Sequence, residues 1–82
     1  MNTHPIVETV KDIYSTGTNE YQRVWFEHFI VYLEGYDEPF RMSKKMVKDI
    51  DYVPRVGDKI TCFIEEGRLK NVKILFEHNP NE

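Results

Sequence analysis

The sequence predicts an all-β protein, a small barrel of five strands with one short helix between the third and fourth strands. Three observations support this fold class. Residues 21–34, YQRVWFEHFIVYLE, are rich in the β-branched and aromatic residues that favour strands. Residues 59–65 and 68–76 alternate apolar and polar side chains around a Glu66-Gly67 turn. The chain has only 82 residues, and closing so small a sheet into a barrel removes its exposed edges.

The first segment, residues 6–14, is compatible with two structures. Its apolar residues have the spacing of a helix: Ile6, Val7, Val10, Ile13 and Tyr14. The residue types themselves prefer strands, so we favour a strand over a helix. A bulge at Lys11-Asp12 would then place Val10 and Ile13 on one side of it. The polar residues 15–19, STGTN, predict a turn or loop.

Residues 21–34 are predicted to form one long strand with a bend. Val24 and Phe26 share one phase of the alternation, whereas Phe29, Val31 and Leu33 follow the opposite phase. A bulge at residues 27–28 would restore a single core face, and such a bend lets a strand serve both halves of a barrel. The outer face would then carry Arg23, Trp25, Ile30 and Tyr32.

The remaining elements follow from local signals. After a turn at residues 35–39 comes a short third strand, residues 40–42, and Ser43 resembles a helix N-cap. The helix would have an apolar stripe and a basic face, formed respectively by Met46, Val47 and Ile50 and by Lys44, Lys45 and Lys48. In the last two strands the inward side chains are Ile60, Cys62 and Ile64, then Val72, Ile74 and Phe76. We expect one domain over residues 1–82, ordered over 5–78, with a short polar C-terminal tail.

The charge of the chain is unevenly distributed. The net charge is −3, but residues 1–40 carry two basic against seven acidic groups, and residues 41–76 carry nine basic against five acidic groups. The charges either solvate exposed faces or polarise the surface toward a ligand. The single Cys62 excludes an internal disulfide framework, and no apolar run is long enough to cross a bilayer. A soluble, cytoplasmic protein that does not contact membranes is expected.

The C-terminal part of the chain carries a resemblance. Residues 56–75, VGDKITCFIEEGRLKNVKIL, resemble the last two strands of OB-fold nucleic-acid-binding modules of the cold-shock and single-strand-binding type. The order of predicted elements, with a helix between the third and fourth strands, is also that of an OB-fold. The aromatic motifs of cold-shock domains, such as KGFGFI and VFVHF, are not present. The resemblance implies the barrel and a single-stranded DNA or RNA ligand.

OB barrels hold single strands by stacking bases on aromatic side chains and by basic contacts to the backbone. The residues expected to do this are Arg23, Trp25, Tyr32, Tyr36, Phe40, Arg41, Lys59, Phe63, Arg68, Lys70 and Lys73. The alternative is that the aromatics are core residues, with Trp25 beneath the helix, because core and surface exchange if one strand is shifted by a residue.

The sequence contains no catalytic signature, and neither a metal nor a cofactor is expected. His4, His28 and His78 are far apart, with no cysteine or carboxylate at ligand spacing. His28 is expected to be a packed or rim histidine, and Cys62 a small buried apolar residue. We therefore expect a non-catalytic module that binds single-stranded nucleic acid. The alternative is a protein-interaction module, such as an accessory or inhibitory subunit, that uses the same aromatic patch.

Overall fold

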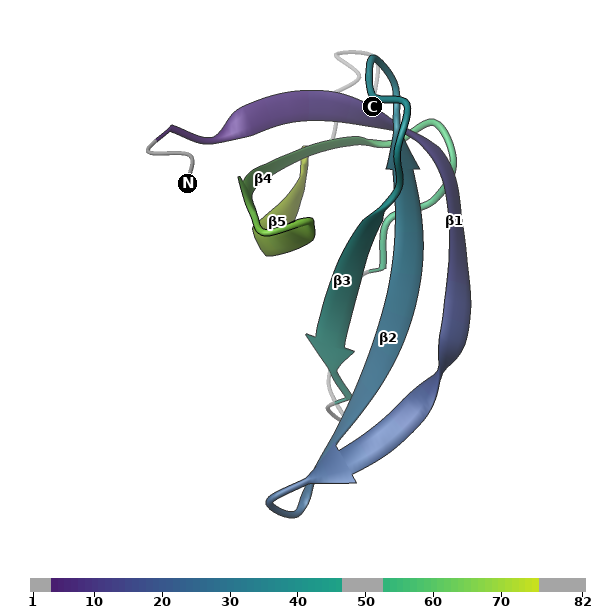
Figure 1. The fold of residues 1–82 in the computed structure, drawn as a ribbon, viewed down its shortest axis with the longest axis vertical. Coiled ribbons are helices and arrows are strands. Elements are labelled where there is room, and N and C mark those ends of the chain that lie inside the picture. Colours follow the sequence, from purple (N-terminus) through teal and green to yellow (C-terminus); the bar gives the residue numbers. More distant parts are fainter. Residues whose placement is uncertain (1–3, 47–52, 76–82) are drawn as a thin grey trace, which may run out of the picture.

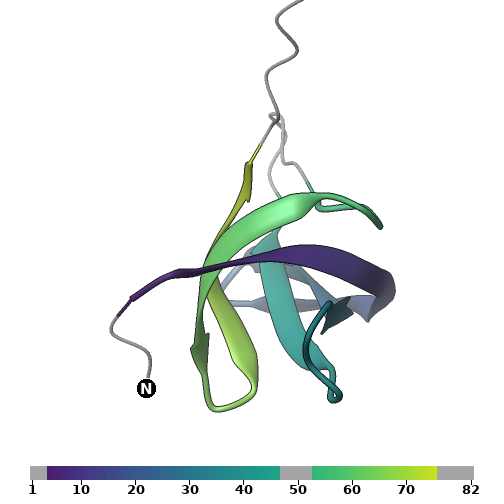
Figure 2. The ribbon, with the colours of Figure 1, turned by 90° about the horizontal axis from the view of Figure 1, so that it is seen from above.

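The protein is an all-β structure, as the sequence predicts. The computed structural model describes residues 4–46 and 53–75. Within these residues five strands follow one another: β1 (Ile6–Tyr21), β2 (Val24–Leu33), β3 (Phe40–Lys45), β4 (Lys59–Glu65) and β5 (Arg68–Leu75). They form one closed sheet in the order β1-β2-β3-β5-β4, which returns to β1 (Figures 1 and 2).

The strand that serves both halves of the ring is β1. Its first residues, Ile6 to Thr9, pair with β4, and the residues from Val10 onward pair with β2. The register shifts between Val10 and Asp12, so Lys11 is an extra residue, and this confirms the predicted strand and its bulge. Val10 is 1% exposed and Ile13 packs against the core, as expected of residues on one side. A bent second strand was predicted for this role, and that prediction is wrong.

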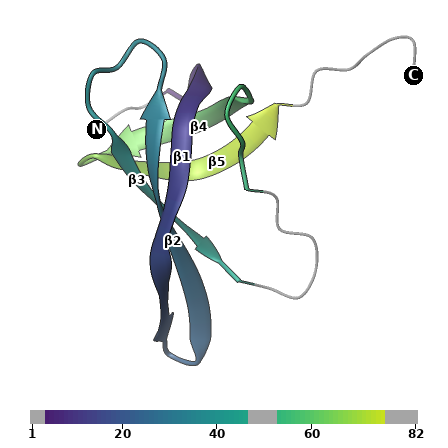
Figure 3. The same cartoon turned by 90° about the vertical axis from the view of Figure 1, so that its right-hand side faces the viewer.

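The predicted loop at residues 15–19 is also wrong, because β1 continues through it to Tyr21. A second shift, between Ser15 and Gly17, leaves Thr16 as an extra residue. The chain reverses instead at Gln22 and Arg23, which both have positive φ (52° and 66°). This is the geometry of a tight two-residue hairpin turn. The β1–β2 hairpin extends well beyond the rest of the ring (Figure 3), so its polar residues reflect exposure and not a turn.

The alternation in β2 is unbroken, which corrects the predicted bulge at residues 27–28. Strands β2 and β3 pair without a shift from Phe26↔Lys45 to Val31↔Phe40. The extra residue lies across the ladder, at Thr16 of β1. Phe29, Val31 and Leu33 are buried as predicted (6%, 0% and 0% exposed).

The predicted placement of Val24 and Phe26 on that same core face is wrong. With no extra residue in β2, Val24 and Phe26 lie on the opposite face, with His28, Ile30 and Tyr32. Trp25 and Glu27 continue the face of Phe29. This part of β2 lies in the hairpin that extends beyond the rest of the ring, and Trp25 is therefore 50% exposed although it shares a face with Phe29.

The predicted helix cap at Ser43 is wrong. Ser43, Lys44 and Lys45 belong to β3 and lie opposite His28, Glu27 and Phe26 of β2. Strand β2 is long enough to pair with these three residues of β3. This pairing outweighs the local preference of the sequence for a helix. Residues 4–46 and 53–75 contain no helix. The rest of the predicted helix, with Val47, Lys48 and Ile50, lies outside the described residues.

The β4–β5 hairpin forms as predicted. Ile60 and Cys62 are buried, Ile64 packs against the core, and Glu66 and Gly67 make the turn with positive φ (51° and 73°). In β5, Val72 and Ile74 pack against the core, while Phe76 lies outside the described residues. The buried cluster contains only apolar residues: Val10, Phe29, Val31, Leu33, Met42, Ile60, Cys62 and Leu69.

The turn at Gln22 and Arg23 gives a first prediction. Neither residue favours positive φ, whereas Asn-Gly is preferred in such turns. Replacing both, Gln22→Asn with Arg23→Gly, should raise the free energy of unfolding by about 1 kcal/mol in urea denaturation. Gly67→Ala is the matched control at the other hairpin, and it should lower stability. A double variant less stable than the parent would contradict the turn.

Candidate functional site

The outer face of β1, β2 and β3 brings together aromatic and cationic residues. Residues paired directly across two neighbouring strands share a face of the sheet, in the antiparallel pairs and in the parallel β3–β5 pair alike. Tyr14 lies opposite Ile30, Ile30 lies opposite Arg41, and Arg41 is paired with Arg68 of β5. One row therefore crosses four strands, from a tyrosine through an apolar residue to two guanidinium groups.

Further apolar side chains extend this face along β2. Phe26, Ile30 and Tyr32 are each half-buried, and alternate residues of a strand lie about 6.6 Å apart. Tyr14 on the neighbouring strand is 49% exposed. We call these four residues the outer stripe. The rings of Tyr14, Phe26 and Tyr32 are partly accessible to solvent, although the core residues of β2 on the other face remain buried.

The two tyrosines of the outer stripe interact. The pKa of Tyr14 is raised above 10.0, first by partial desolvation, then by the neighbouring Tyr32 hydroxyl, with which it shares a hydrogen bond, and by Asp12. Both of the named neighbours disfavour a phenolate at Tyr14. This end of the stripe therefore presents a neutral ring with a polar tip.

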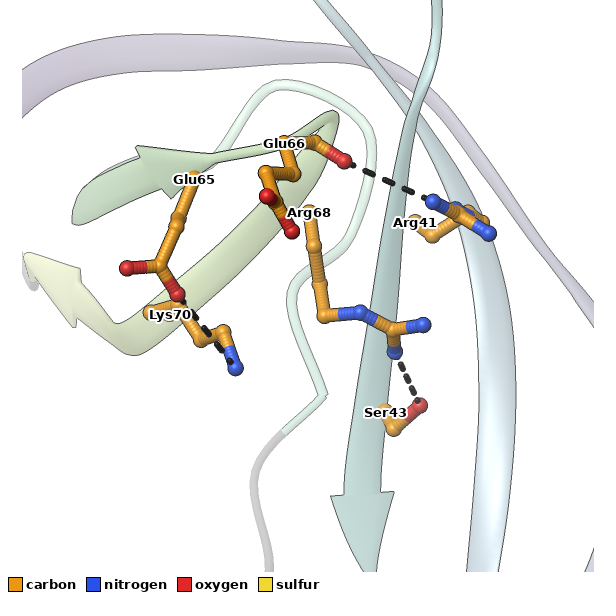
Figure 4. A network of polar contacts seen from close by, with 6 residues as sticks. All are labelled: Arg41, Ser43, Glu65, Glu66, Arg68 and Lys70. Carbon is orange, nitrogen blue, oxygen red and sulfur yellow. Dashed lines mark hydrogen bonds and ion pairs between the residues drawn. The ribbon is translucent and has the colours of Figure 1, made fainter. Parts of the chain in front are cut away.

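Arg41 and Arg68 lie side by side beside the stripe. Arg41 Nη2 donates to the main-chain oxygen of Glu66 at 3.4 Å, and Arg68 Nη1 donates to Ser43 Oγ at 3.5 Å (Figure 4). Within residues 4–46 and 53–75, neither guanidinium forms an ion pair with a carboxylate. Like charges directly opposite each other in a sheet repel, so a bound anion would relieve this repulsion. Lys70, by contrast, is 3.9 Å from Glu65.

A polar group of three side chains interrupts the outer stripe between Phe26 and Ile30. His28 Nδ1 lies 2.7 Å from Ser43 Oγ, and His28 Nε2 contacts Asn19 Oδ1. Because Ser43 also accepts from Arg68, hydrogen bonds connect β1, β2, β3 and β5 on this face. We call Asn19, His28 and Ser43 the polar node.

The inner face of the projecting hairpin carries a different set of residues. Trp25 and Met46 are 50% and 48% exposed, and Met46 N–H donates to the Trp25 carbonyl at 2.8 Å. Glu20 is opposite Trp25 in the ladder. Trp25 is thus exposed, as expected, but it lies on the opposite face from Tyr32.

Of the residues that the sequence proposed, the structure brings Tyr32, Arg41 and Arg68 together on one face. Tyr36 and Phe40 are instead packed against the core, with their rings edge to face at 5.3 Å and 77°. Their placement in a surface site is therefore corrected: Phe40 lies opposite the buried Val31, so its ring faces inward.

The other proposed residues lie away from the outer stripe. Arg23 lies in the β1–β2 hairpin turn, and Lys59 at the start of β4 already interacts with another group of the protein. Phe63 is half-buried and lines a groove of about 440 Å³ on β4 and β5 with Thr61 and Lys73, whereas Lys70 has its acidic neighbour. Sequence reasoning missed Tyr14, Phe26 and the polar node. Unbroken alternation through β2 would have identified Phe26 and His28.

Other chemistries find little support in the described residues. No group of three or more histidine, cysteine or acidic side chains within residues 4–46 and 53–75 could hold a metal ion. Burial, with a smaller contribution from Glu8, raises the pKa of Cys62 to about 11, so its thiol stays protonated at neutral pH. In the same residues, no helix has the length and hydrophobicity needed to span a bilayer.

Comparison of the chain with protein-family models, with curated proteins and with solved structures finds no match. Functional inference therefore depends on the geometry of the outer face.

The phase of β2 gives a second prediction. Phe29→Ala should lower the free energy of unfolding by about 3–5 kcal/mol, because it opens a cavity in the core. Phe26→Ala should cost about 1 kcal/mol, because its ring lies on the outer face. Urea denaturation of the two variants measures this difference. Equal losses would indicate that both rings share the core face.

Proposed function

We propose that this chain is an OB-fold module that binds single-stranded nucleic acid on the outer face of β1, β2 and β3, without catalysis. Closure of the ring by β1 with β4, and of β3 with β5, supports the fold, since an OB-fold is a five-stranded barrel of the Greek-key type. In such barrels the face of the second and third strands receives the ligand, and the outer stripe occupies this position.

One observation carries the proposal: the exposed ring of Tyr14 and the half-buried rings of Phe26 and Tyr32 share a face with two guanidinium groups that have no carboxylate partner among the described residues. Bases stack on aromatic rings, each worth about 1–3 kcal/mol, whatever their sequence. A guanidinium group can bind a phosphate in bidentate fashion, through two parallel hydrogen bonds. Stacking and phosphate contacts are common to DNA and RNA, so the proposal covers both.

The proposal also includes a cytoplasmic location. Cys62 is a free, buried thiol, which fits a reducing compartment.

Binding of a fluorescently labelled oligothymidylate, followed by anisotropy, tests this function. Phe26→Ala should weaken binding by about 5- to 150-fold. Arg41→Ala should weaken it and reduce the dependence of log K on log salt by about one.

The matched control is Lys70→Ala, which removes a cation that has a carboxylate within reach on the other half of the ring. It should change the affinity less than two-fold, an estimate for a surface cation away from the site. Absence of binding at low salt, or equal losses for Arg41→Ala and Lys70→Ala, would reject the outer face as the site.

A second candidate function is protein binding, as an accessory or inhibitory subunit. The observation that favours it is the exposed Trp25 beside the exposed Met46. Tryptophan is enriched at the centres of protein interfaces. Because this pair lies on the opposite face from Phe26, the two functions are separable by substitution.

A pull-down from cell extract with the immobilised protein tests this second candidate function. Trp25→Ala should lose a captured partner, while Phe26→Ala should retain it. The oligonucleotide should leave the emission of Trp25 nearly unchanged, since its indole lies on the other face. Capture of the same partner by Trp25→Ala would exclude this face.

A further inference from the structure

The polar node contains the imidazole of His28, an ionisable group that Ser43 connects to Arg68. Nε2 of His28 contacts the side-chain amide oxygen Oδ1 of Asn19, which accepts, so Nε2 carries the hydrogen in this contact. Nδ1 contacts the Ser43 hydroxyl at 2.7 Å, and a hydroxyl can either donate or accept. Both the neutral and the protonated imidazole therefore satisfy the same two partners.

The two states differ in what Ser43 presents to solvent. With a neutral ring, the Ser43 hydroxyl donates to Nδ1 and accepts from Arg68. With a protonated ring, Nδ1 donates to Ser43 Oγ, which can still accept from Arg68 through its second lone pair. The hydroxyl hydrogen is then free to turn outward and donate to a ligand.

The charged groups nearest to His28 on the outer face are cations. Arg41 and Lys45 flank Ser43 on β3, and Arg68 reaches it from β5. On β1 the neighbours are uncharged: Gly17 lies opposite His28, next to Asn19, and further along are the phenols of Tyr14 and Tyr21. The single carboxylate among the residues paired on the outer face of β1, β2 and β3 is Asp12, opposite Tyr32 and two rows away.

A phosphate beside Arg41 and Arg68 would reverse this balance. Its negative charge offsets the cations and favours an imidazolium next to it. Resting on the function proposed above, we propose that Arg41, Arg68, Ser43 and His28 form one phosphate subsite, and that binding of a phosphate there transfers one proton from solvent to His28. By linkage, acid then tightens binding.

The sign follows from proton uptake. Imidazole is the side chain that ordinarily changes charge between roughly pH 5 and 8. If binding takes up one proton, affinity increases as the pH falls through this range, by at most about ten-fold per pH unit. If binding takes up no proton at this histidine, affinity is flat over the same range.

The test is the affinity for labelled oligothymidylate at constant ionic strength between pH 8.5 and 5.5. The wild-type protein should bind progressively more tightly as the pH falls. His28→Gln, which keeps hydrogen-bonding groups but cannot be charged, should lose the pH dependence of the affinity. His4→Gln with His78→Gln is the matched control and should retain it.

Two further measurements use the unaltered histidine. Calorimetric titration of the wild type at pH 7 in buffers of different ionisation enthalpy should show proton uptake on binding. The His28 ring signals in NMR should titrate at higher pH with oligothymidylate than without it. These measurements decide the question even if His28→Gln does not fold.

The outcomes separate the two proposals. No binding by the wild type at any pH rejects the nucleic-acid function, and the subsite with it. Binding that is independent of pH, or whose pH dependence survives in a folded His28→Gln protein, rejects the proton-coupled subsite and leaves the nucleic-acid function in place.

Discussion

Closure of the ring depends on the main-chain pairing of β1 around Val10. Val10 N–H donates to the Asp58 carbonyl and its own carbonyl accepts from Gly57 N–H, both at 2.8 Å. The extra residue Lys11 follows at once, and β1 leaves β4 to continue with β2 alone. Because a bulge increases local twist, one strand can bend between both halves of the ring. Without this bend, the β1–β2–β3 and β4–β5 parts would not share a core.

The same bulge leaves one edge of β1 without a partner strand, since beyond Val10 β1 pairs with β2 alone among the described strands. Side chains satisfy main-chain groups at each irregularity. Asp12 Oδ1 accepts from Ile13 N–H at 2.9 Å, and Ser15 Oγ accepts from Gly17 N–H at 3.3 Å. Natural sheets use bulges and such interruptions to discourage pairing with other chains. The polar sequence of residues 15–19 is therefore that of a protected edge.

Local patterns predicted the elements whose neighbours lie close in sequence. The β4–β5 hairpin and the bulge at Lys11 are of this kind, because Gly67 and the positions of Val10 and Ile13 are local signals. The phase of β2 could not be decided locally. Trp25 and Phe26 are both large and apolar, and which of them faces inward depends on the pairing of β2 with β3 and on where the ring ends. Asn19, Ser43 and Arg68 meet His28 only through the pairing of the strands, so no local sequence signal brings these residues together.

The placement of charges resolves a difficulty that the sequence raised. An acidic first half would repel a nucleic acid if its carboxylates surrounded the aromatic stripe. The ladder instead places Glu20 and Glu27 on the inner face, opposite Trp25 and Thr18. The cations on the outer face are Arg41 and Lys45 of β3 and Arg68 of β5. All three belong to the basic second half of the chain. Asp12 is then the single carboxylate among the residues paired on the outer face of β1, β2 and β3, and the local cationic field there can steer a polyanion despite a net charge of −3.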